Sequence, residues 1–352
     1  MNNTDFTFDW PLVGNQHITE YLGKCVNNKH VSGAYIFSGP DNLGKTTLAK
    51  SFAKILLCKT EGADKKLPCG RCSSCRQFKD SSQNNSGQTE ISEIHGDFHI
   101  IKKAKDKKNI SIEQVREFIY SLSLSSFMGG YKIGIIKHAD SLSLSAANAL
   151  LKTLEEPKSK VVIILIASDM DNLPATIVSR SQILRFNPLG IEALYDYLVK
   201  ARKIGREQAK ELSRVCLGRP ALAIKFLENS ETYDFYKQQI ETFIDFKEQN
   251  INERFSGINN LFAPKLSNQE SVKLARRILQ AWQGVLRDYL LLEYSFNNLI
   301  QNYIKFDKLK IFKARISVFD ILRMAKAIRR AEKNIVANVN PKLALEEVAL
   351  AF

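Results

Sequence analysis

Residues 39–46 read Gly-Pro-Asp-Asn-Leu-Gly-Lys-Thr, the complete G-x-x-x-x-G-K-[ST] pattern of a phosphate-binding loop. Glycines let such a loop curl until consecutive N–H groups point at phosphate oxygens, and the following helix adds the positive end of its dipole. In this pattern the lysine reaches the β- and γ-phosphates and the threonine hydroxyl binds Mg²⁺. A glycine-rich turn that binds nothing is the alternative, but a strand expected before the loop and a helix after it favour the nucleotide. The pattern predicts a site for ATP or ADP with Mg²⁺ made by Gly39, Gly44, Lys45, Thr46 and Thr47.

The acidic pair that ATP hydrolysis needs is missing from its expected place. One carboxylate would organise Mg²⁺ and the next would polarise the attacking water, both at the end of a later strand. The matching strand here is followed by Lys137 and His138, and the nearby acid, Asp140, sits too late. A lysine cannot ligate Mg²⁺, and losing a positioned base costs about 10²- to 10⁴-fold in rate. We expect nucleotide binding with little or no ATPase activity.

Four of the six cysteines are bunched in a pattern typical of a metal site: Cys58, Cys69, Cys72 and Cys75. Four thiolates with no open position describe a structural zinc site and not a catalytic one. Zinc is favoured over disulfides because the chain is expected to be cytoplasmic. Four reduced core cysteines are disfavoured because proline, glycine and serine surround them, and an iron–sulfur cluster stays a minor alternative.

Composition places the chain among ordinary globular proteins with a basic surface. It has 352 residues, 44% of them hydrophobic, and a formal net charge of +14. Such an excess favours polyanionic partners, although a solvated basic surface would look the same. No run of 18 apolar residues occurs, and residues 1–10 lack a signal-peptide core, so a cytoplasmic, nucleoid-associated protein is expected.

The distribution of apolar residues predicts an α/β region followed by an all-α region. Five near-continuous apolar segments read as parallel strands covered on both faces: Ala34–Ser38, Phe98–Ile101, Lys132–Lys137, Val161–Ala167 and Gln182–Phe186. After Pro188 almost everything reads as helical. Three short helices are expected first, at Ile191 to Arg202, Arg206 to Leu217 and Pro220 to Leu227, and a long helical region then runs to Phe352.

A phosphate loop followed by a four-cysteine insertion resembles the clamp-loader subunits of bacterial DNA polymerase III, which are AAA+ proteins. Four further segments are similar to motifs of that family: His30–Pro40, His95–His99, Ala146–Pro157 and Leu173–Ser181. The third matches the family's helix almost letter for letter. Two positions depart from the pattern, because Gly96 replaces a proline and Ser181 replaces the cysteine of a Ser-Arg-Cys motif.

The resemblance implies a three-part architecture: an AAA+ nucleotide-binding domain over residues 1–188 with a zinc insertion at 58–75, a three-helix lid over 189–230, and a helical collar over 231–352. In the family the arginine of the Ser-Arg-Cys motif reaches the nucleotide of the neighbouring subunit. Arg180 thereby inherits the role of a trans-acting finger, the alternative being a surface arginine that caps a helix end. Ser168 and Arg219 fall near the family's two nucleotide-sensing positions.

Within the family the resemblance is greatest to the δ′ type, which keeps the arginine finger but has an altered ATPase site. Lys137 and His138 in place of the acidic pair, together with Arg180, point in that direction. Trp282–Asp288 and Asn338–Glu346 are similar to carboxy-terminal signatures of δ′. The intact phosphate loop is a departure, since many δ′ chains have a degraded one.

This resemblance implies a component of the polymerase III holoenzyme that helps load the sliding clamp onto primed DNA. Its partners would be γ/τ and δ subunits in a hetero-oligomeric ring, the clamp, and primer-template DNA through the complex. One rival is an ATP-hydrolysing γ/τ-type motor subunit. The other is a zinc-dependent nucleic-acid-binding module with a vestigial phosphate loop.

Overall fold

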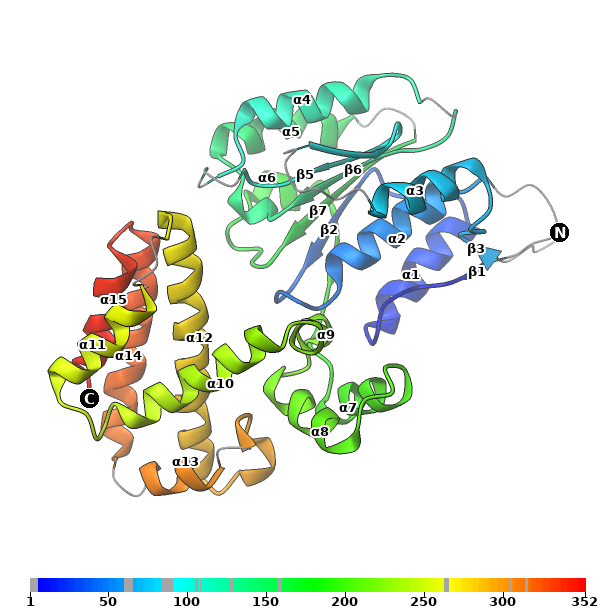
Figure 1. Cartoon of the computed structure of the whole chain (residues 1–352). Coiled ribbons are helices and arrows are strands. Elements are labelled where there is room, and N and C mark those ends of the chain that lie inside the picture. The colour runs from blue at the N-terminus through cyan, green and yellow to red at the C-terminus, as the bar shows by residue number, and fades with distance from the viewer. Residues whose placement is uncertain are drawn as a thin grey trace. The chain divides into compact units, whose positions relative to one another are not determined.

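The computed structural model describes residues 6–59, 66–83, 91–104, 107, 109–126, 129–156, 160–262, 266–303, 306–313 and 316–352. The chain divides into two units, Met1–Leu189 and Gly190–Phe352 (Figure 1). Within the segment predicted as the zinc insertion, residues 60–65 lie outside the described residues, as does Pro157 at the end of the Ala146–Pro157 motif. None of the described helices combines the length and the apolar character needed to cross a bilayer.

A six-stranded sheet forms the centre of the first unit, with strand order β4-β5-β6-β7-β2-β8. Its strands are β2 (Ala34–Ser38), β4 (Ile91–His95), β5 (Phe98–Ile101), β6 (Lys132–Lys137), β7 (Val161–Ala167) and β8 (Gln182–Arg185). The five predicted strands are confirmed and run parallel to one another, with β8 ending one residue earlier than expected. Strand β4, which pairs antiparallel with β5 at the sheet edge, is not among the predicted strands. Its sequence, Ile-Ser-Glu-Ile-His, mixes polar and apolar residues and lacks the continuous apolar run of a strand buried on both faces.

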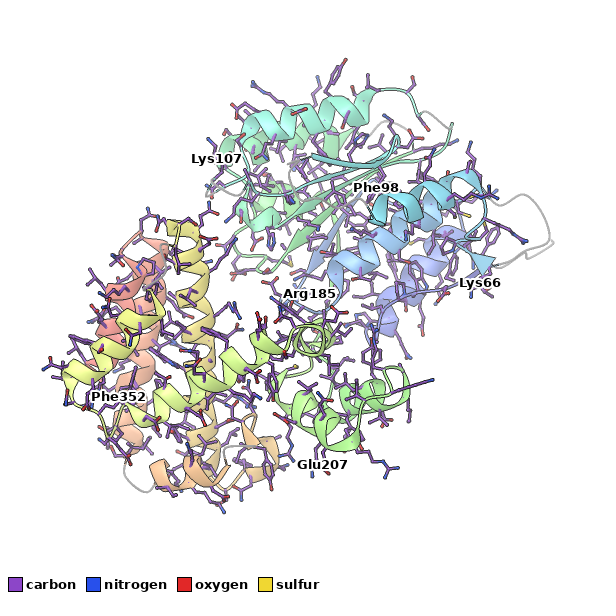
Figure 2. All side chains as sticks on the ribbon, viewed as in Figure 1. Lys66, Phe98, Lys107, Arg185, Glu207 and Phe352 are labelled. Carbon is purple, nitrogen blue, oxygen red and sulfur yellow. The ribbon has the colours of Figure 1, made fainter. Side chains whose placement is uncertain are left out.

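Helices cover the sheet on both faces because alternate side chains of each strand point to opposite sides. Val162 and Ile164 of β7 pack with the core formed by α1 (Gln16–Asn27), α2 (Lys45–Leu57) and α3 (Ser73–Gln83). Ile163 and Leu165 pack with the opposite core, whose helices are α4 (Ile112–Ser123), α5 (Leu144–Glu155) and α6 (Ala175–Val178). Figure 1 shows these two groups of helices on the two sides of the sheet. In Figure 2 the label of Phe98 marks this fully buried interior, while Lys66 lies at the surface.

Two smaller features complete the first unit. Short strands β1 (Thr7–Phe8) and β3 (Lys66–Leu67) pair in parallel as a separate sheet. Helix α4 begins with a capping box in which the side chains of Ser111 and Gln114 each accept a hydrogen bond from the other residue's backbone N–H.

The second unit is helical throughout its described residues, as expected. Its α-helices are α7 (Ile191–Lys200), α8 (Arg206–Val215), α9 (Pro220–Glu228), α10 (Ser230–Asp245), α11 (Ile251–Leu261), α12 (Asn268–Glu293), α13 (Phe306–Lys313), α14 (Val318–Val336) and α15 (Pro341–Ala349). A 3₁₀ turn, η2 (Asn297–Leu299), follows α12. The first three helices occupy the places predicted for a lid, whereas the boundary between lid and collar near residue 230 stays a prediction. Trp282 of α12 is fully buried at the centre of the core and packs against Phe243 and Phe246.

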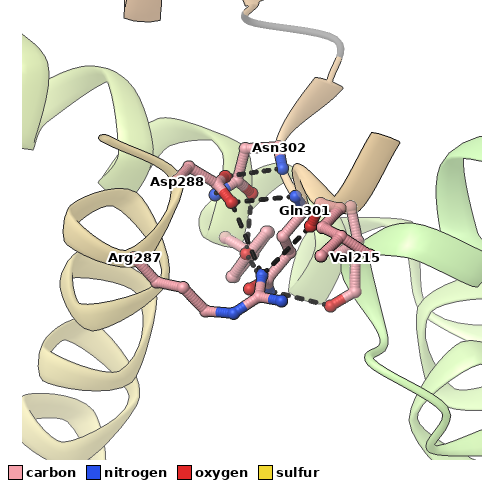
Figure 3. A network of polar contacts seen from close by, with 7 residues as sticks. Val215, Arg287, Asp288, Gln301 and Asn302 are labelled. Carbon is pink, nitrogen blue, oxygen red and sulfur yellow. Dashed lines mark hydrogen bonds and ion pairs between the residues drawn. The ribbon is translucent and has the colours of Figure 1, made fainter. Parts of the chain in front are cut away.

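A buried carboxylate connects α12 to the segment that follows η2 (Figure 3). Asp288, which is fully buried, accepts hydrogen bonds from the backbone N–H groups of Gln301 and Asn302, each at 2.8 Å. The amide of Gln301 in turn donates to the carbonyl of Val215 at 2.9 Å and to the hydroxyl of Tyr236 at 2.9 Å. Burial raises the pKa of Asp288, and the two backbone hydrogen bonds oppose that shift. This network ties four separate stretches of the second unit together: α8, α10, α12 and the segment after η2.

We expect Asp288→Ala to lower the free energy of unfolding by about 2–4 kcal/mol, because two buried N–H groups would lose their acceptor. Urea denaturation followed by circular dichroism measures this change. Arg287→Ala is the matched control, since its guanidinium lies 3.6 Å from Asp288 and is 42% exposed. That loss should stay below about 1 kcal/mol. Equal effects of the two substitutions would show that the backbone hydrogen bonds contribute little.

Candidate functional site

The carboxyl ends of three parallel strands meet at one edge of the sheet and place the predicted site residues there. In the pairing register Ser38 of β2 lies opposite Ala167 of β7, and Lys137 of β6 lies opposite Ile166. The phosphate loop leaves β2, Ser168 follows β7, and His138 follows β6. Residues more than a hundred positions apart in the sequence therefore share one edge, which is where ligands of open α/β sheets bind.

The phosphate loop has the strand–loop–helix context that its sequence predicts. Gly39 has φ of +136°, and a Cβ atom there would collide with the backbone carbonyl of Phe186. Gly44 has φ of +89° and directly precedes α2. Both glycines are therefore required by the backbone conformation. Thr46 is half-buried and Thr47 is exposed at the start of the helix.

Lys45 is turned inward against its own loop. Its side chain is 5% exposed, and its ammonium group donates hydrogen bonds to the carbonyl oxygens of Gly39 and Pro40, the latter at 3.0 Å. Its Nζ atom lies 3.8 Å from Oδ1 of Asp41. Burial lowers the pKa of Lys45, while the charges of Asp41 and Asp140 oppose that shift. The cation that would meet a phosphate is thus surrounded by oxygen atoms of the protein.

Ser168 lies beside the phosphate loop, as its predicted nucleotide-sensing role requires. It follows the last residue of β7, and its hydroxyl donates a hydrogen bond of 2.7 Å to Oδ1 of Asp41. The same carboxylate oxygen is therefore close to both Ser168 and Lys45. This contact of Asp41 was not anticipated from the sequence, in which the two residues are 127 positions apart.

Lys137 and His138 stand at the end of β6, where a hydrolytic site would carry its acids. Lys137 is half-buried, and burial together with the positive charges of Lys50 and Lys102 lowers its pKa. His138 is exposed and has a left-handed backbone with φ of +55°. The local field at this strand end is therefore set by cations, which do not attract Mg²⁺.

Asp140 is closer to the phosphate loop than its position in the sequence suggests. It lies too late in the sequence for the expected acidic pair, but a 3₁₀ turn, η1 (Ala139–Ser141), follows His138 and contains it. Burial raises the pKa of Asp140, and hydrogen bonds from backbone amides, including that of Ser168, oppose the shift. Its charge also acts on Lys45. The position of an acid relative to a strand end depends on such a turn, and no sequence motif predicted this turn.

The four predicted cysteines converge on one point at the end of α2. Their sulfur atoms all lie within 4.8 Å of one another, and none of them forms a disulfide. Four ligands at the usual Zn–S distance would be about 3.8 Å apart in a tetrahedron. The pair Cys69 and Cys75 comes close to that value, with 4.0 Å between the sulfurs. The arrangement fits a closed four-thiolate metal site.

Backbone groups support the cluster and orient its sulfurs. The N–H of Cys69 donates to the sulfur of Cys58, and the N–H of Cys72 donates to that of Cys69, both at 3.4 Å. Gly70, with φ of +73°, makes the turn between them. Burial raises the pKa of the Cys75 thiol, and the neighbouring Cys72 and Cys58 add to that shift. A bound cation would reverse this balance and favour the thiolates.

Arg180 lies just after α6 and is held by residues of its own unit. Its Nη2 atom is 2.8 Å from Oε1 of Glu155 at the end of α5. Its Nη1 atom donates to the carbonyl of Thr176 at 3.0 Å and to the hydroxyl of Ser179 at 3.3 Å. The side chain is 36% exposed, so the guanidinium is accessible while held in place.

Arg219, the other predicted sensing residue, belongs to the second unit. It directly precedes Pro220 at the start of α9, and its Nε atom donates to the carbonyl of Cys216 at 3.0 Å. The structure therefore brings together in the first unit the phosphate loop, Ser168 and the strand end of β6. It shows the local contacts of Arg219 only within the helical unit.

Comparisons with known proteins find one matching family model and several similar proteins. The family model described as DNA polymerase III, delta subunit, matches residues 14–190. The subunit delta′ of Bacillus subtilis is 24% identical over 333 residues, which cover 95% of this chain and 94% of that protein. The subunit tau of the same organism is 32% identical over 200 residues, which cover 57% of this chain but 32% of tau. A gamma-subunit-related protein of Thermotoga maritima has a similar solved structure, with a TM-score of 0.49, 15% identity and coverage of 95% and 97% of the two chains.

Proposed function

This chain belongs to the DNA polymerase III delta-subunit family, and we propose that it acts as a clamp-loader subunit of the δ′ type. In this role it binds nucleotide statically, turns over little or no ATP, and supplies Arg180 to the nucleotide of a neighbouring subunit. One observation carries the proposal: a complete phosphate loop adjoins a strand end occupied by Lys137 and His138. The alignment with a δ′ subunit along nearly the whole chain supports it.

Electrostatics at the end of β6 explain why hydrolysis should be poor. Lys137 and the nearby Lys50 and Lys102 place three cations where a carboxylate would hold Mg²⁺. His138 is exposed, and a neutral imidazole carries no charge with which to attract the ion. Asp140 lies in the turn beyond the strand and not at the strand end itself. A water molecule at the terminal phosphate would lack a positioned base.

Arg180 can reach the nucleotide of a neighbouring subunit because its contacts within this chain are weak. Exposed ion pairs contribute about 0–1 kcal/mol, so the phosphates of an adjoining subunit would outcompete Glu155. The guanidinium would then exchange one carboxylate for a more highly charged phosphate group. We propose Glu155 as the residue that keeps the finger in position until such a partner is present.

The cysteine cluster is proposed to hold a structural Zn²⁺ ion. Cys58, Cys69, Cys72 and Cys75 would be its ligands, and their thiolates would leave no coordination position for a substrate. The ion would connect the end of α2 to the start of α3 and so stabilise the carboxyl end of the helix that follows the phosphate loop.

The proposed partners follow from the family and from the charge. Relatives of this chain are δ′ and tau subunits, which favours a hetero-oligomeric ring with γ/τ-type and δ-type subunits. The sliding clamp and primer-template DNA would be engaged through that ring in the cytoplasm, at the nucleoid. A net charge of +14 suits a polyanionic partner such as primed DNA. Co-purification with a tagged chain tests whether clamp-loader subunits follow it.

The purified chain should bind ADP without sustained ATP turnover. We expect Lys45→Ala to weaken ADP binding by at least about tenfold, which corresponds to about 1.4 kcal/mol. Fluorescence titration with a labelled ADP measures the affinity, and phosphate release measures turnover. Lys54→Ala on the same helix is the matched control, because Lys54 lies over the ring of Phe78 and away from the loop, and it should bind ADP nearly as the unmodified chain does. Brisk turnover by the isolated chain would instead support a γ/τ-type motor.

A further inference from the structure

The third residue of the phosphate loop is an aspartate, in a loop whose other features suit an anion. Asp41 carries a negative charge, and its side chain is 61% exposed at the mouth of the loop. It accepts a hydrogen bond of 2.7 Å from the hydroxyl of Ser168 and lies 3.8 Å from the ammonium of Lys45. The carboxylate of Asp41 therefore contacts both the hydroxyl of Ser168 and the ammonium of Lys45.

Those two groups are the ones that a terminal phosphate would need. In this type of loop the lysine reaches the β- and γ-phosphates, and Ser168 sits at the end of the adjacent strand, on the same sheet edge. A γ-phosphate that contacted Ser168 would have to displace Asp41. The carboxylate and the phosphate would otherwise stand side by side with like charges, which repel strongly at short range.

The α- and β-phosphates face a different set of groups. Backbone N–H groups of the loop and the amino terminus of α2 cradle them, and none of these groups depends on Asp41. Near Lys45 the charge of Asp140 adds a second carboxylate, whereas the cations Lys50, Lys102 and Lys137 act on one another at the end of β6. A diphosphate can thus be held while the contact between Asp41 and Ser168 stays intact.

We propose that Asp41 is a specificity-determining residue that makes this phosphate loop select nucleoside diphosphates over triphosphates. The inference rests on the proposed nucleotide binding and deepens it. It gives a physical reason for a static site: a loop that keeps its own carboxylate at the position of the terminal phosphate retains ADP and admits ATP poorly.

The test compares affinities of the full chain for ADP and for ATPγS in Mg²⁺ at a fixed salt concentration near 0.15 M. The unmodified chain should bind ADP at least about tenfold more tightly than ATPγS. Asp41→Asn keeps the shape and an oxygen that accepts from Ser168 but removes the charge. It should raise the affinity for ATPγS about tenfold or more and change that for ADP by less than about threefold.

Asp171→Asn is the matched control, because it removes the same charge from an exposed residue in the loop after β7. A second measurement uses Ser168→Ala in both backgrounds. Alone it should alter ATPγS affinity by less than about threefold. In the Asp41→Asn background it should lower that affinity about tenfold, since a neutral amide holds the Ser168 hydroxyl more weakly than a carboxylate does and the phosphate can then compete for it. Thermal melting confirms that each variant is folded.

Several outcomes would overturn the proposal. These are equal gains for both nucleotides, an equal gain from Asp171→Asn, additive effects of Ser168→Ala and Asp41→Asn, or no nucleotide binding by any variant. Lys45→Ala separates this failure from that of the proposed function. If Lys45→Ala abolishes ADP binding while Asp41→Asn changes nothing, the selectivity of Asp41 alone is wrong. If Lys45→Ala leaves ADP binding unchanged, the nucleotide site itself is wrong, and the inference falls with it.

Discussion

Replacing Arg180 by alanine should reduce ATP turnover at the neighbouring site of the assembled complex by about 10³-fold or more, the range found for arginine fingers. The reason is that a cation delivered from outside stabilises charge which develops on the phosphoryl group during transfer. Within its own chain Arg180 contributes an ion pair with Glu155 whose two side chains are 36% and 48% exposed. Its loss should therefore leave the stability of the chain nearly unchanged.

Single-turnover ATP hydrolysis by the reconstituted complex, with sliding clamp and primed DNA, measures this effect. Arg185→Ala is a control, since Arg185 is another exposed arginine of the same unit. Glu155→Gln is a second control, because it removes the charge that pairs with Arg180 while the guanidinium remains available to the neighbour, so turnover should fall far less than with Arg180→Ala. Hydrolysis at the normal rate with Arg180→Ala would contradict the finger. Failure of the complex to assemble would make Arg180 an interface residue instead.

Replacing Cys72 by serine should release the metal ion and lower the apparent unfolding temperature by about 5–10 °C, because structural zinc contributes directly to folding free energy. Without a cation the ionisation of Cys75 is unfavourable, since burial raises the pKa of its thiol. Metal binding must therefore release protons, and its affinity should fall as the pH is lowered. Elemental analysis of the purified chain should find one zinc ion per chain, and the variant should have none.

Cys25→Ser provides the control, since Cys25 lies outside the cluster. It should keep the ion and melt near the temperature of the unmodified chain. An iron–sulfur cluster would appear as iron in the analysis and as visible absorption. DNA binding separates the remaining rival: if the folded Cys72→Ser chain loses affinity for DNA at a temperature below its transition, the cysteine module is a nucleic-acid contact.

Local patterns determined much of this protein. The phosphate loop was predictable because its glycines, lysine and threonine are needed within eight consecutive residues. The five parallel strands were predictable because strands buried on both faces must be continuously apolar. The cysteine cluster was predictable from spacing, because three cysteines at intervals of three residues lie close together in any compact turn. The edge strand β4 escaped because its mixed sequence has no such requirement.

The side chains that surround the phosphate loop were decided by the tertiary structure. The strand order places β7 between β2 and β6, and this order alone brings Ser168 to Asp41 and Asp140 to the same edge. Likewise, Asp288 finds the backbone of Gln301 only because the chain returns after η2. The sequence by itself predicts a nucleotide site that lacks the usual acids. Which carboxylates lie near the phosphate loop depended on long-range register and on one 3₁₀ turn, because contacts across more than a hundred residues are set by how whole elements pack and not by neighbouring residues.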